Sequence, residues 1–227
     1  MPDTKDILSE IERCLLRGHA ALWGVADVGL VQQQLTPESD AAVPEGLNCA
    51  VVFAVRLLDE VLEGLEDRPT PLYFHHYRQV NFLLDRTGLE VATIIQEHGF
   101  RSLAVPATQS LSRNPMRGLL SHKILAWAAG LGWIGRNNLL VTPQFGARVR
   151  LASVLTDAPL ESGRPAEGGC GECRACVEAC PAGAIGSSAK DFDLPACEEM
   201  LGKFAGIPFV GQHICGVCVK ACRGKSV

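Results

Sequence analysis

The spacing of apolar residues predicts alternating helices and strands over the first two thirds of the chain. Residues 4–17 carry apolar side chains at helical intervals, which predicts an amphipathic helix at the start. Residues 20–28 and 49–57 are expected as strands, and the second is a nearly unbroken apolar run, as in a strand buried on both faces of its sheet. A long helix is expected over residues 75–98, because apolar side chains recur along one of its sides.

The pattern then changes to shorter elements. Gly99 is expected to end the long helix, and residues 102–106 are expected to form a short third strand. Residues 107–118 are polar and contain a proline, which is typical of a loop. Ser121 is expected to cap a helix that ends near residue 129.

Two further strands are expected over residues 139–142 and 148–155, most simply as a hairpin around the turn between them. Strands that alternate with long helices favour a layered domain of α/β or α+β type over residues 1–157. Residues 158–169 are rich in Gly, Pro and Glu, which is typical of a linker to a second, smaller domain.

Eight cysteines lie in the last sixty residues, in the spacing of iron–sulfur ligands. One run reads C-x2-C-x2-C-x3-C with a proline directly after it; a second reads C-x2-C-x3-C and has one cysteine upstream. Each iron of a [4Fe–4S] cluster takes one thiolate, and the cysteine before the proline binds the other cluster. The spacing therefore predicts two clusters within residues 158–227. Cluster one is assigned to Cys170, Cys173, Cys176 and Cys222, and cluster two to Cys180, Cys197, Cys215 and Cys218.

Zinc and disulfides are the alternative interpretations of these cysteines. Zinc uses C-x2-C pairs and leaves the longer run unexplained. Disulfides need an oxidising compartment, whereas residues 1–6 carry neither an apolar signal stretch nor a twin-arginine motif. No apolar run is long enough to span a membrane, so a cytoplasmic protein is expected. Cys14 and Cys49 sit among apolar residues and are expected to be core thiols.

Composition adds one uneven distribution of charge. The chain of 227 residues is 47% hydrophobic and 20% charged, with a formal net charge of −4. Residues 98–156 contain no Asp or Glu, which is typical of a site for an anionic ligand such as a phosphate or carboxylate. The alternative is that the basic side chains lie on different surfaces or pair with acids elsewhere. These side chains are Arg101, Arg113, Arg117, Lys123, Arg136, Arg148 and Arg150.

Gly130, Gly132 and Gly135 satisfy the spacing G-x-G-x-x-G. A dinucleotide site needs a strand before this motif and a helix after it. Here a helix is expected before it and a strand after it, so a nicotinamide site is not expected. The glycines favour instead a sharp bend of the backbone or its close approach to a flat, bulky group.

Residues 121–160 read SHKILAWAAGLGWIGRNNLLVTPQFGARVRLASVLTDAPL, and CGECRACVEACPAGAI follows further along the chain. Together these two stretches resemble the epoxyqueuosine reductase family. The part from LLVTPQFG through RVRLASVLTDAPL also resembles the reductive dehalogenases. The resemblance covers residues 121–222 and, more weakly, 20–110. It implies an α+β protein, in which a nitroreductase-like domain over residues 1–157 holds base-off cobalamin and a small bacterial ferredoxin-like domain holds two [4Fe–4S] clusters.

The resemblance also implies a chemistry. The clusters would pass single electrons to a corrinoid, which would reduce an organic substrate while the protein supplies binding, orientation and electrostatics. The alternative is an electron-transfer or activator protein that reduces the cofactor of a partner. The expected partners are a low-potential electron donor of ferredoxin or flavodoxin type and a small molecule or corrinoid protein. A tRNA partner is less favoured, because the chain is acidic and poor in aromatic residues.

In this family an acidic residue just after the strand that would match residues 102–106 donates the proton. Here residues 105–110 read VPATQS, which contains no acid, so reduction of a tRNA epoxide requires an acid from elsewhere in the fold. The remaining candidate proton donors are Tyr77, His122 and Lys123. The candidates for holding the corrinoid are Gly130, Gly132, Trp133, Gly135, Arg148 and Arg150. The alternatives are structural: a capping or structural role for His122, a core position for Trp133 and a solvated strand for the two arginines.

Overall fold

The computed structural model describes residues 4–32, 43–108, 112–113 and 116–224, which form two compact units. Helix α4 (Pro71–Glu97) and strand β8 (Val149–Thr156) each contribute residues to both units. The division predicted at residue 157 stays a prediction. The first unit consists of Met1–Val55, Asn81–Leu131 and Arg150–Ala166, and the second of Arg56–Val80, Gly132–Val149 and Glu167–Val227.

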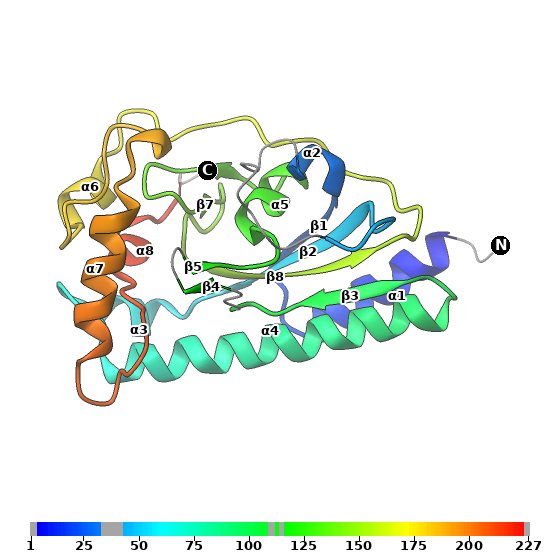
Figure 1. The fold of residues 1–227 in the computed structure, drawn as a ribbon, viewed down its shortest axis with the longest axis horizontal. Coiled ribbons are helices and arrows are strands. Elements are labelled where there is room, and N and C mark those ends of the chain that lie inside the picture. The colour runs from blue at the N-terminus through cyan, green and yellow to red at the C-terminus, as the bar shows by residue number, and fades with distance from the viewer. Residues whose placement is uncertain (1–3, 33–42, 109–111, 114–115, 225–227) are drawn as a thin grey trace. The chain divides into compact units, whose positions relative to one another are not determined.

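A four-stranded sheet forms the centre of the first unit, in the order β1-β2-β8-β3 (Figure 1). Its strands besides β8 are β1 (Leu22–Asp27), β2 (Cys49–Arg56) and β3 (Ser102–Val105). β1 is antiparallel to β2, with Val25 opposite Val51, and β3 is antiparallel to β8. Residues 50–55 of β2 are buried, which confirms the strand expected to have both faces covered.

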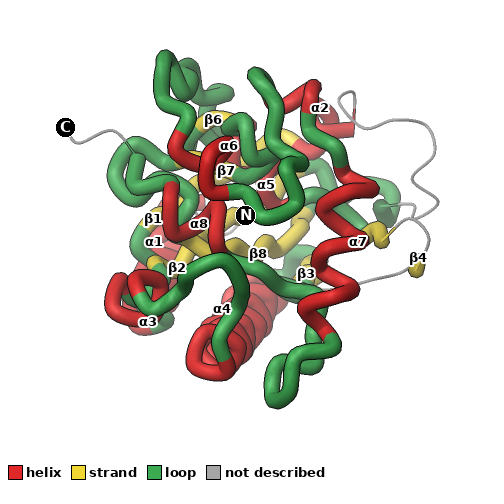
Figure 2. The backbone as a smooth tube through the Cα atoms, turned by 90° about the vertical axis from the view of Figure 1, so that its left-hand side faces the viewer, coloured by secondary structure: helices red, strands yellow, loops and turns green. Residues whose placement is uncertain are grey.

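Helices cover both faces of this sheet. Those of the first unit are α1 (Thr4–Arg17), α2 (Val28–Gln32), α5 (His122–Ala128) and residues 81–97 of α4. Figures 1 and 2 show α1 and α4 on one face and α2 and α5 on the other. A Cβ on Gly18 would clash with the side chain of Thr87, so glycine lets the chain after α1 approach α4 closely. The fully buried Phe53, Leu84 and Leu125 belong to the core between these layers.

The second unit is built from short elements. They are α3 (Asp59–Glu63), residues 71–80 of α4, β6 (Trp133–Ile134), β7 (Leu140–Val141), α6 (Ala175–Ala179), a 3-10 helix (Ala189–Asp191), α7 (Leu194–Ala205) and α8 (Val217–Ala221). β6 and β7 pair antiparallel, and α8 contacts both α6 and α3 (Figure 2). Asp193 caps α7 by accepting the backbone N–H of Ala196 at 3.0 Å.

The mixed α and β composition predicted from the sequence is confirmed, with differences at the ends of elements. α4 begins at Pro71, earlier than expected, because Thr70 accepts the backbone N–H of Tyr73 at its start. Gly99 ends this helix as expected, with a φ of 84°. Ser121 precedes α5 but makes no side-chain capping bond, so its predicted capping role was wrong.

The predicted hairpin between residues 139–142 and 148–155 was also wrong. β7 pairs with β6, whereas β8 joins the central sheet beside β3. The turn itself exists, since Thr142 and Gly146 form an antiparallel bridge. The long apolar β8 is buried over residues 152–156, and the two-residue β7 is too short to cover it. The loop expected over residues 107–118 lies partly outside the described residues and contains β4 (Ser112–Arg113) paired with β5 (Met116–Arg117).

Within the described ranges, none of the helices combines the length and apolar character needed to cross a bilayer.

Candidate functional site

The eight cysteines predicted as iron–sulfur ligands all lie in the second unit, on and around three short helices. Cys176 lies in α6 and Cys180 directly follows it. Cys197 lies in the first turn of α7, where the cap by Asp193 fixes the start of the helix. The remaining five lie in the loop before α6, before α8, within α8 and just after it: Cys170, Cys173, Cys215, Cys218 and Cys222.

The electrostatic neighbours of these thiols fall into two sets. Burial raises the pKa of Cys176, and the neighbouring thiols of Cys222, Cys170 and Cys173 raise it further. The pKa of Cys222 is likewise raised by burial and by Cys170 and Cys173. One half of the cysteine array is therefore gathered around Cys176.

The second set lies around Cys218. Burial raises the pKa of Cys218 strongly, and Cys215, Cys180 and Cys197 are among the thiols that raise it further. Burial also raises the pKa of Cys215 to about 11, with Cys197 and Cys180 as its thiol neighbours. Cys176 is the one member of the first set that also acts on Cys218.

Each set supplies the four thiolates that one cubane requires. In the described part of the chain, no three His, Cys, Asp or Glu side chains converge closely enough to hold one metal ion. A cubane distributes its four thiolates over four different irons, so its ligands need not converge on one point. The donor sets fit two [4Fe–4S] clusters, and the ligand assignment itself stays a prediction.

Arg148, expected as a corrinoid contact, is bound to acids of its own unit. It is only 3% exposed, and its guanidinium lies 2.8 Å from Asp59 and 3.0 Å from Glu63. It also donates to the carbonyl of Lys220 at the end of α8, while the N–H of Ala147 donates to the carbonyl of Cys222. Arg148 therefore holds the segment that carries Cys222 against α3.

A cavity of about 250 Å³ in the second unit adjoins this network. Its lining includes the charged side chains of Glu63, Glu66, Arg148, Lys220 and Arg223. This volume is smaller than the roughly 300–1,000 Å³ of typical cofactor pockets, and Arg148 is already paired. The cavity does not fit a corrinoid.

The glycines expected beside a flat group are explained by close packing of the chain on itself. A Cβ on Gly132 would clash with the backbone of Val141, and one on Gly135 with its side chain. Gly130 has a φ of 84° and lies against the carbonyl of Arg164. α5 precedes these glycines and β6 follows Gly132, which confirms that the dinucleotide arrangement of strand, turn and helix is absent from these described residues.

Trp133, also expected at the corrinoid, is buried in the second unit. It forms an apolar cluster with Val141 and Ala147, and Cys170 and Cys222 pack against this cluster. The indole therefore lies beside two predicted ligands of cluster one.

His122, in the first unit, has both ring nitrogens bound. Nε2 lies 2.9 Å from the carbonyl oxygen of Pro106 and Nδ1 2.9 Å from the hydroxyl of Ser153. A carbonyl only accepts, so Nε2 carries the proton and Nδ1 accepts from the hydroxyl. Burial lowers the pKa of His122; the bond to Pro106 and the charge of Asp85 oppose this, and Arg150 adds to it. The two hydrogen bonds thereby hold the imidazole ring in one orientation.

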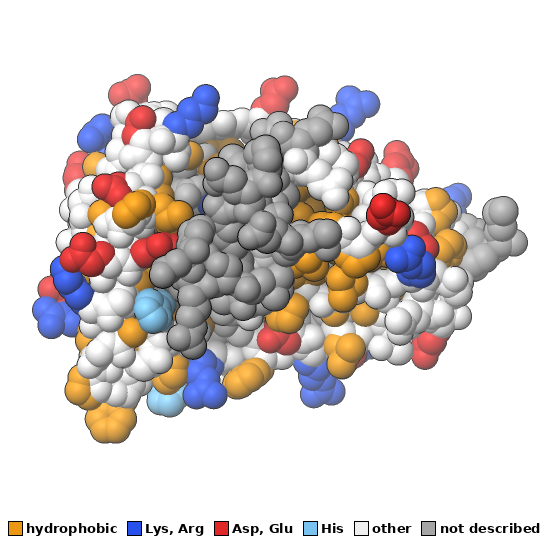
Figure 3. Space-filling model, viewed as in Figure 1, with side chains coloured by type: hydrophobic (Ala, Val, Ile, Leu, Met, Phe, Trp, Pro, Cys, Tyr) orange, Lys and Arg blue, Asp and Glu red, His pale blue; other side chains and the backbone are white. Residues whose placement is uncertain are grey.

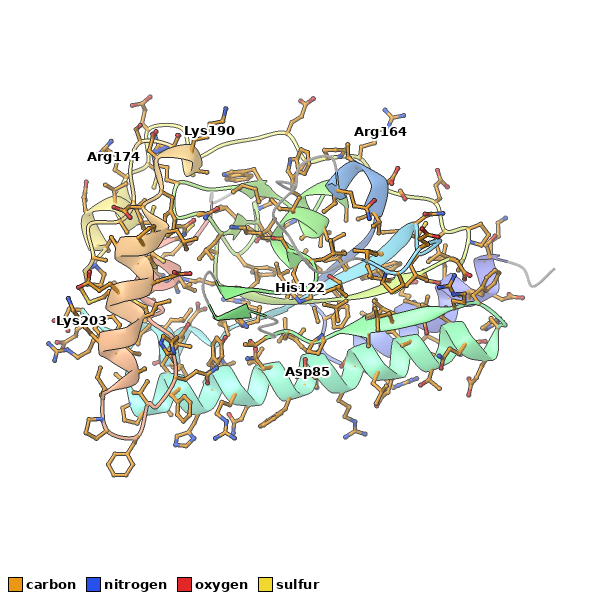
Figure 4. The ribbon with its side chains drawn as sticks, viewed as in Figure 1. Asp85, His122, Arg164, Arg174, Lys190 and Lys203 are labelled. Atoms are coloured by element: carbon orange, nitrogen blue, oxygen red, sulfur yellow. The ribbon has the colours of Figure 1, made fainter. Side chains whose placement is uncertain are left out.

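Arg150 and two side chains of α4 bind the segment that follows β3. Asp85 accepts the N–H of Ala107 at 2.7 Å, and Asn81 donates to the hydroxyl of Thr108 at 3.0 Å. Arg150 donates to Asn81, to the carbonyl of Ala107 and to Thr108. Figure 4 shows Asp85 on the side of α4 that faces the sheet, below His122. Residues 106–108 are thus fixed by a network of polar side chains.

Sequence reasoning missed Asn81 and Asp85, which interrupt the apolar side of the long helix four residues apart. Polar residues at such an interval on a buried side were the available signal. Asp85 brings a carboxylate to the backbone N–H of Ala107, within the stretch of residues 105–110 that contains no acid of its own.

Lys123, the next residue of α5, has an unusual acidity. Burial lowers its pKa to about 8, against about 10.4 in an unfolded chain. Between these values the unfolded state binds more protons, so the free energy of unfolding should rise with pH from about 8 to about 10.4 and stay constant below that window. We expect NMR of the reductively ¹³C-methylated protein to show one lysine with a midpoint near pH 8.

Lys123→Arg is the matched variant for this prediction, because it keeps a positive charge and removes the titrating amine. The early-titrating signal should vanish in this variant. Midpoints near 10 for every lysine signal of the unmodified sequence would contradict the lowered pKa.

Tyr77, the other candidate proton donor, belongs to the second unit, so the three candidates are not brought together within one unit. It is buried, with its ring centroid 6.4 Å from that of Tyr73. Beside it, His76 accepts the backbone N–H of Leu58 at 3.1 Å. The catalytic roles of Tyr77, His122 and Lys123 stay predictions.

Comparisons with known proteins add sequence and fold relationships to this geometry. No protein-family model matches the sequence. Epoxyqueuosine reductase of Listeria monocytogenes serovar 1/2a is 38% identical over 106 residues, which are 43% of this chain and 27% of that protein. The chain thus aligns with about a quarter of the length of this curated relative.

Solved structures match more of the chain at low identity. An epoxyqueuosine reductase with an epoxyqueuosine-modified tRNA-Tyr stem loop covers 97% of this chain and 65% of its own, with a TM-score of 0.63 and 21% identity. The catabolic reductive dehalogenase NpRdhA with 3-bromo-4-hydroxybenzoic acid covers 93% of this chain and 31% of its own, with a TM-score of 0.68 and 20% identity. A third structure is that of a reductive dehalogenase, and its description refers to B12-dependent dehalogenation. The match covers 78% of this chain and 25% of that protein, with a TM-score of 0.58 and 22% identity.

At these identities the solved structures show a shared fold, and the curated sequence supplies the family likeness. Over part of its length the chain is similar in sequence to epoxyqueuosine reductases, and it shares its fold with solved epoxyqueuosine reductases and reductive dehalogenases.

Proposed function

We propose that this protein is an oxidoreductase that carries two [4Fe–4S] clusters in its second unit and uses them to deliver single electrons to a corrinoid for reduction of an organic substrate. The cysteines before α6 and around α7 and α8 form a ferredoxin-like domain in this proposal, and residues 1–157 a nitroreductase-like domain. When bound, the clusters supply one-electron transfer and the corrinoid supplies the chemistry at the substrate.

The division of eight thiols into two sets of four is the observation that carries this proposal. Cys176 has the thiols of Cys170, Cys173 and Cys222 as neighbours. The thiol neighbours of Cys218 belong mainly to the second set. Three members of the sets, Cys180, Cys197 and Cys222, are distant in sequence from the runs that they complete. A fold that brings each to its set supports two four-thiolate sites over isolated pairs of cysteines.

The corrinoid enters the proposal through the relatives and not through assigned residues. The six side chains and glycines predicted to hold it make other contacts within their own units, and the cavity described above is too small. We therefore assign no residue to a corrinoid. The alternative function therefore stays open, in which the clusters reduce the cofactor of a partner protein and this chain performs no substrate chemistry.

The substrate is a separate question. Asp85 supports epoxyqueuosine reductase activity in which the proton-donating acid comes from another element of the fold, because it brings a carboxylate to residues 106–108. A tRNA partner has less support, since acidic and basic side chains lie interspersed on the visible face of the second unit (Figure 3). Glu199 and Lys203 of α7 form such a pair at 2.7 Å.

Metal analysis and an EPR titration test the two parts of the proposal. Anaerobically reconstituted protein should contain about eight irons and eight acid-labile sulfides per chain, as two cubanes require. Added cob(II)alamin should change to a base-off EPR signal if the chain binds the corrinoid. Iron near zero or four would overturn the two-cluster proposal.

The two functions predict different EPR results. A base-off signal with both clusters present supports the reductase. An unchanged cob(II)alamin signal with both clusters present overturns a resident corrinoid and leaves the electron-transfer function. Cob(II)alamin titrated into an unrelated protein of similar size gives the reference for the EPR signal of the unbound corrinoid.

A further inference from the structure

Three buried side-chain nitrogen atoms in the described part of the chain have no hydrogen-bond partner. They are Trp133 Nε1, Arg136 Nε and Asn137 Nδ2. All three are N–H donors, and all lie within five consecutive residues of the second unit. Buried donors are nearly always paired in folded proteins, so such a group points to an acceptor that the polypeptide itself does not provide.

The first of these donors lies beside the cysteines of cluster one. Trp133 is 8% exposed, and Cys170 and Cys222 pack against its apolar cluster. Gly168 lies so close that a Cβ there would be 2.9 Å from Cε3 of the indole. The indole is therefore fixed between the chain leading into Cys170 and the segment that carries Cys222.

Arg136 and Asn137 approach the same cysteine loop. Nη2 of Arg136 donates to the carbonyl of Gly171 at 2.8 Å, which ties its guanidinium to the loop after Cys170. A Cβ on Gly135 would lie 2.9 Å from Oδ1 of Asn137 and 3.5 Å from Sγ of Cys170. Oδ1 of Asn137 accepts the N–H of Leu139, and Nδ2 of the same side chain has no acceptor among the described residues.

We propose that Trp133, with Asn137 and Arg136, donates N–H hydrogen bonds to the sulfur atoms of the cluster held by Cys170, Cys173, Cys176 and Cys222, and raises the reduction potential of that cluster. This inference rests on the proposed two-cluster function. The sulfur atoms of a cubane carry negative charge and accept hydrogen bonds, and the bonds strengthen when an electron is added. The donors thereby favour the reduced form of this cluster.

Trp133→Phe tests the main donor, because it keeps an aromatic ring and removes the N–H. Potentiometric titration followed by EPR should show that one of the two clusters becomes harder to reduce by about tenfold in its one-electron equilibrium, which corresponds to about 59 mV. The other cluster should be unchanged. In the unsubstituted protein, ENDOR of the reduced cluster should show an exchangeable proton that disappears in D₂O and is missing from the variant.

Trp23→Phe is the matched control, since Trp23 lies on β1 in the first unit. It should leave both potentials unchanged. Asn137→Ser is the second variant if Trp133→Phe does not fold: it removes the amide donor, keeps an oxygen for Leu139, and should shift the same cluster in the same direction.

The outcomes separate this inference from the proposed function. Absence of clusters from the unsubstituted protein overturns the function. Two intact clusters whose potentials are unaffected by both Trp133→Phe and Asn137→Ser overturn the inference and leave the function standing. A change in cob(II)alamin binding without a change in either potential would assign the donors to a corrinoid, which also overturns the inference.

Discussion

Replacing Cys197 with alanine is expected to remove one [4Fe–4S] cluster and spare the other. Cys197 lies in the first turn of α7, and its pKa is raised by burial and then by its neighbour Cys180. Each iron of a cubane requires its own ligand, so loss of one thiolate leaves one iron without protein coordination. Iron should fall from about eight to about four per chain, and one of the two EPR signals of the reduced protein should vanish.

Two further variants locate the loss. Cys222→Ala should remove the other cluster, so the two variants should retain complementary EPR signals. Cys49→Ala is the matched control, because this thiol lies in the first unit and donates to the carbonyl of Leu160. It should keep about eight irons. Full iron content in Cys197→Ala would contradict the assignment of Cys197, and iron loss in Cys49→Ala would show that the assay reports general instability.

Local patterns account for the part of the fold that was predictable from the sequence. The helix at residues 4–17 and the strand β2 follow from apolar spacing over a single element. The short cysteine run before and within α6 has its geometry set by a few consecutive residues. The distant Cys197 and Cys222 were assigned from the requirement of four thiolates for each cluster, and this assignment stays a prediction.

Pairings between distant segments were not predictable. The bond between Arg148 and Asp59 joins residues 89 positions apart, and no local pattern marks it. The predicted hairpin was wrong for the same reason. β8 pairs with β3, which lies about 50 residues away, and not with the strand nearest to it in sequence. Spacing predicts which face of an element is apolar, but not which other element will cover it.

The basic stretch between residues 98 and 156 does not form one anion site from the arginines whose side chains are described. Arg148 is paired with acids, as the alternative interpretation anticipated. Arg150 binds Asn81 and residues 107–108, Arg101 donates to the carbonyl of Glu45, and Arg136 donates to that of Gly171. The side chains of Arg113 and Arg117 lie outside the described residues. Each of the arginines whose side chains are described therefore binds groups that are distant from it in sequence.

Arg148→Met is expected to destabilise the protein by about 2–3 kcal/mol and to accelerate iron loss. Breaking a fully buried ion pair costs about 3–5 kcal/mol, and the half-exposed Asp59 and Glu63 reduce this cost because water screens them. The carbonyl of Lys220 also loses its donor at the end of α8, two residues before Cys222. Urea unfolding followed by circular dichroism, and iron release to a chelator, measure the two effects.

The contribution of Asp59 gives this prediction a pH signature. Its hydrogen bond to Arg148 holds the pKa of Asp59 below the usual range, and Arg56 adds to this. A carboxyl whose folded pKa is lowered stabilises the fold above its unfolded pKa of about 3.9, and loses this effect as the pH falls through the folded pKa. The difference in unfolding free energy between the unsubstituted protein and Arg148→Met should therefore be constant near neutral pH and shrink below about pH 4.

Arg68→Met is the matched control for Arg148→Met. Arg68 lies in the same unit and pairs with Asp67 at 2.7 Å, but both side chains are mostly exposed. An exposed pair of this kind contributes little to stability, so the urea midpoint and the rate of iron release should stay unchanged. Equal effects of the two substitutions would show that the burial of Arg148 and its bond to the cluster-carrying segment do not matter. A large effect of Arg148→Met alone would show that the acids of α3 secure the end of α8 and, with it, the predicted ligand Cys222.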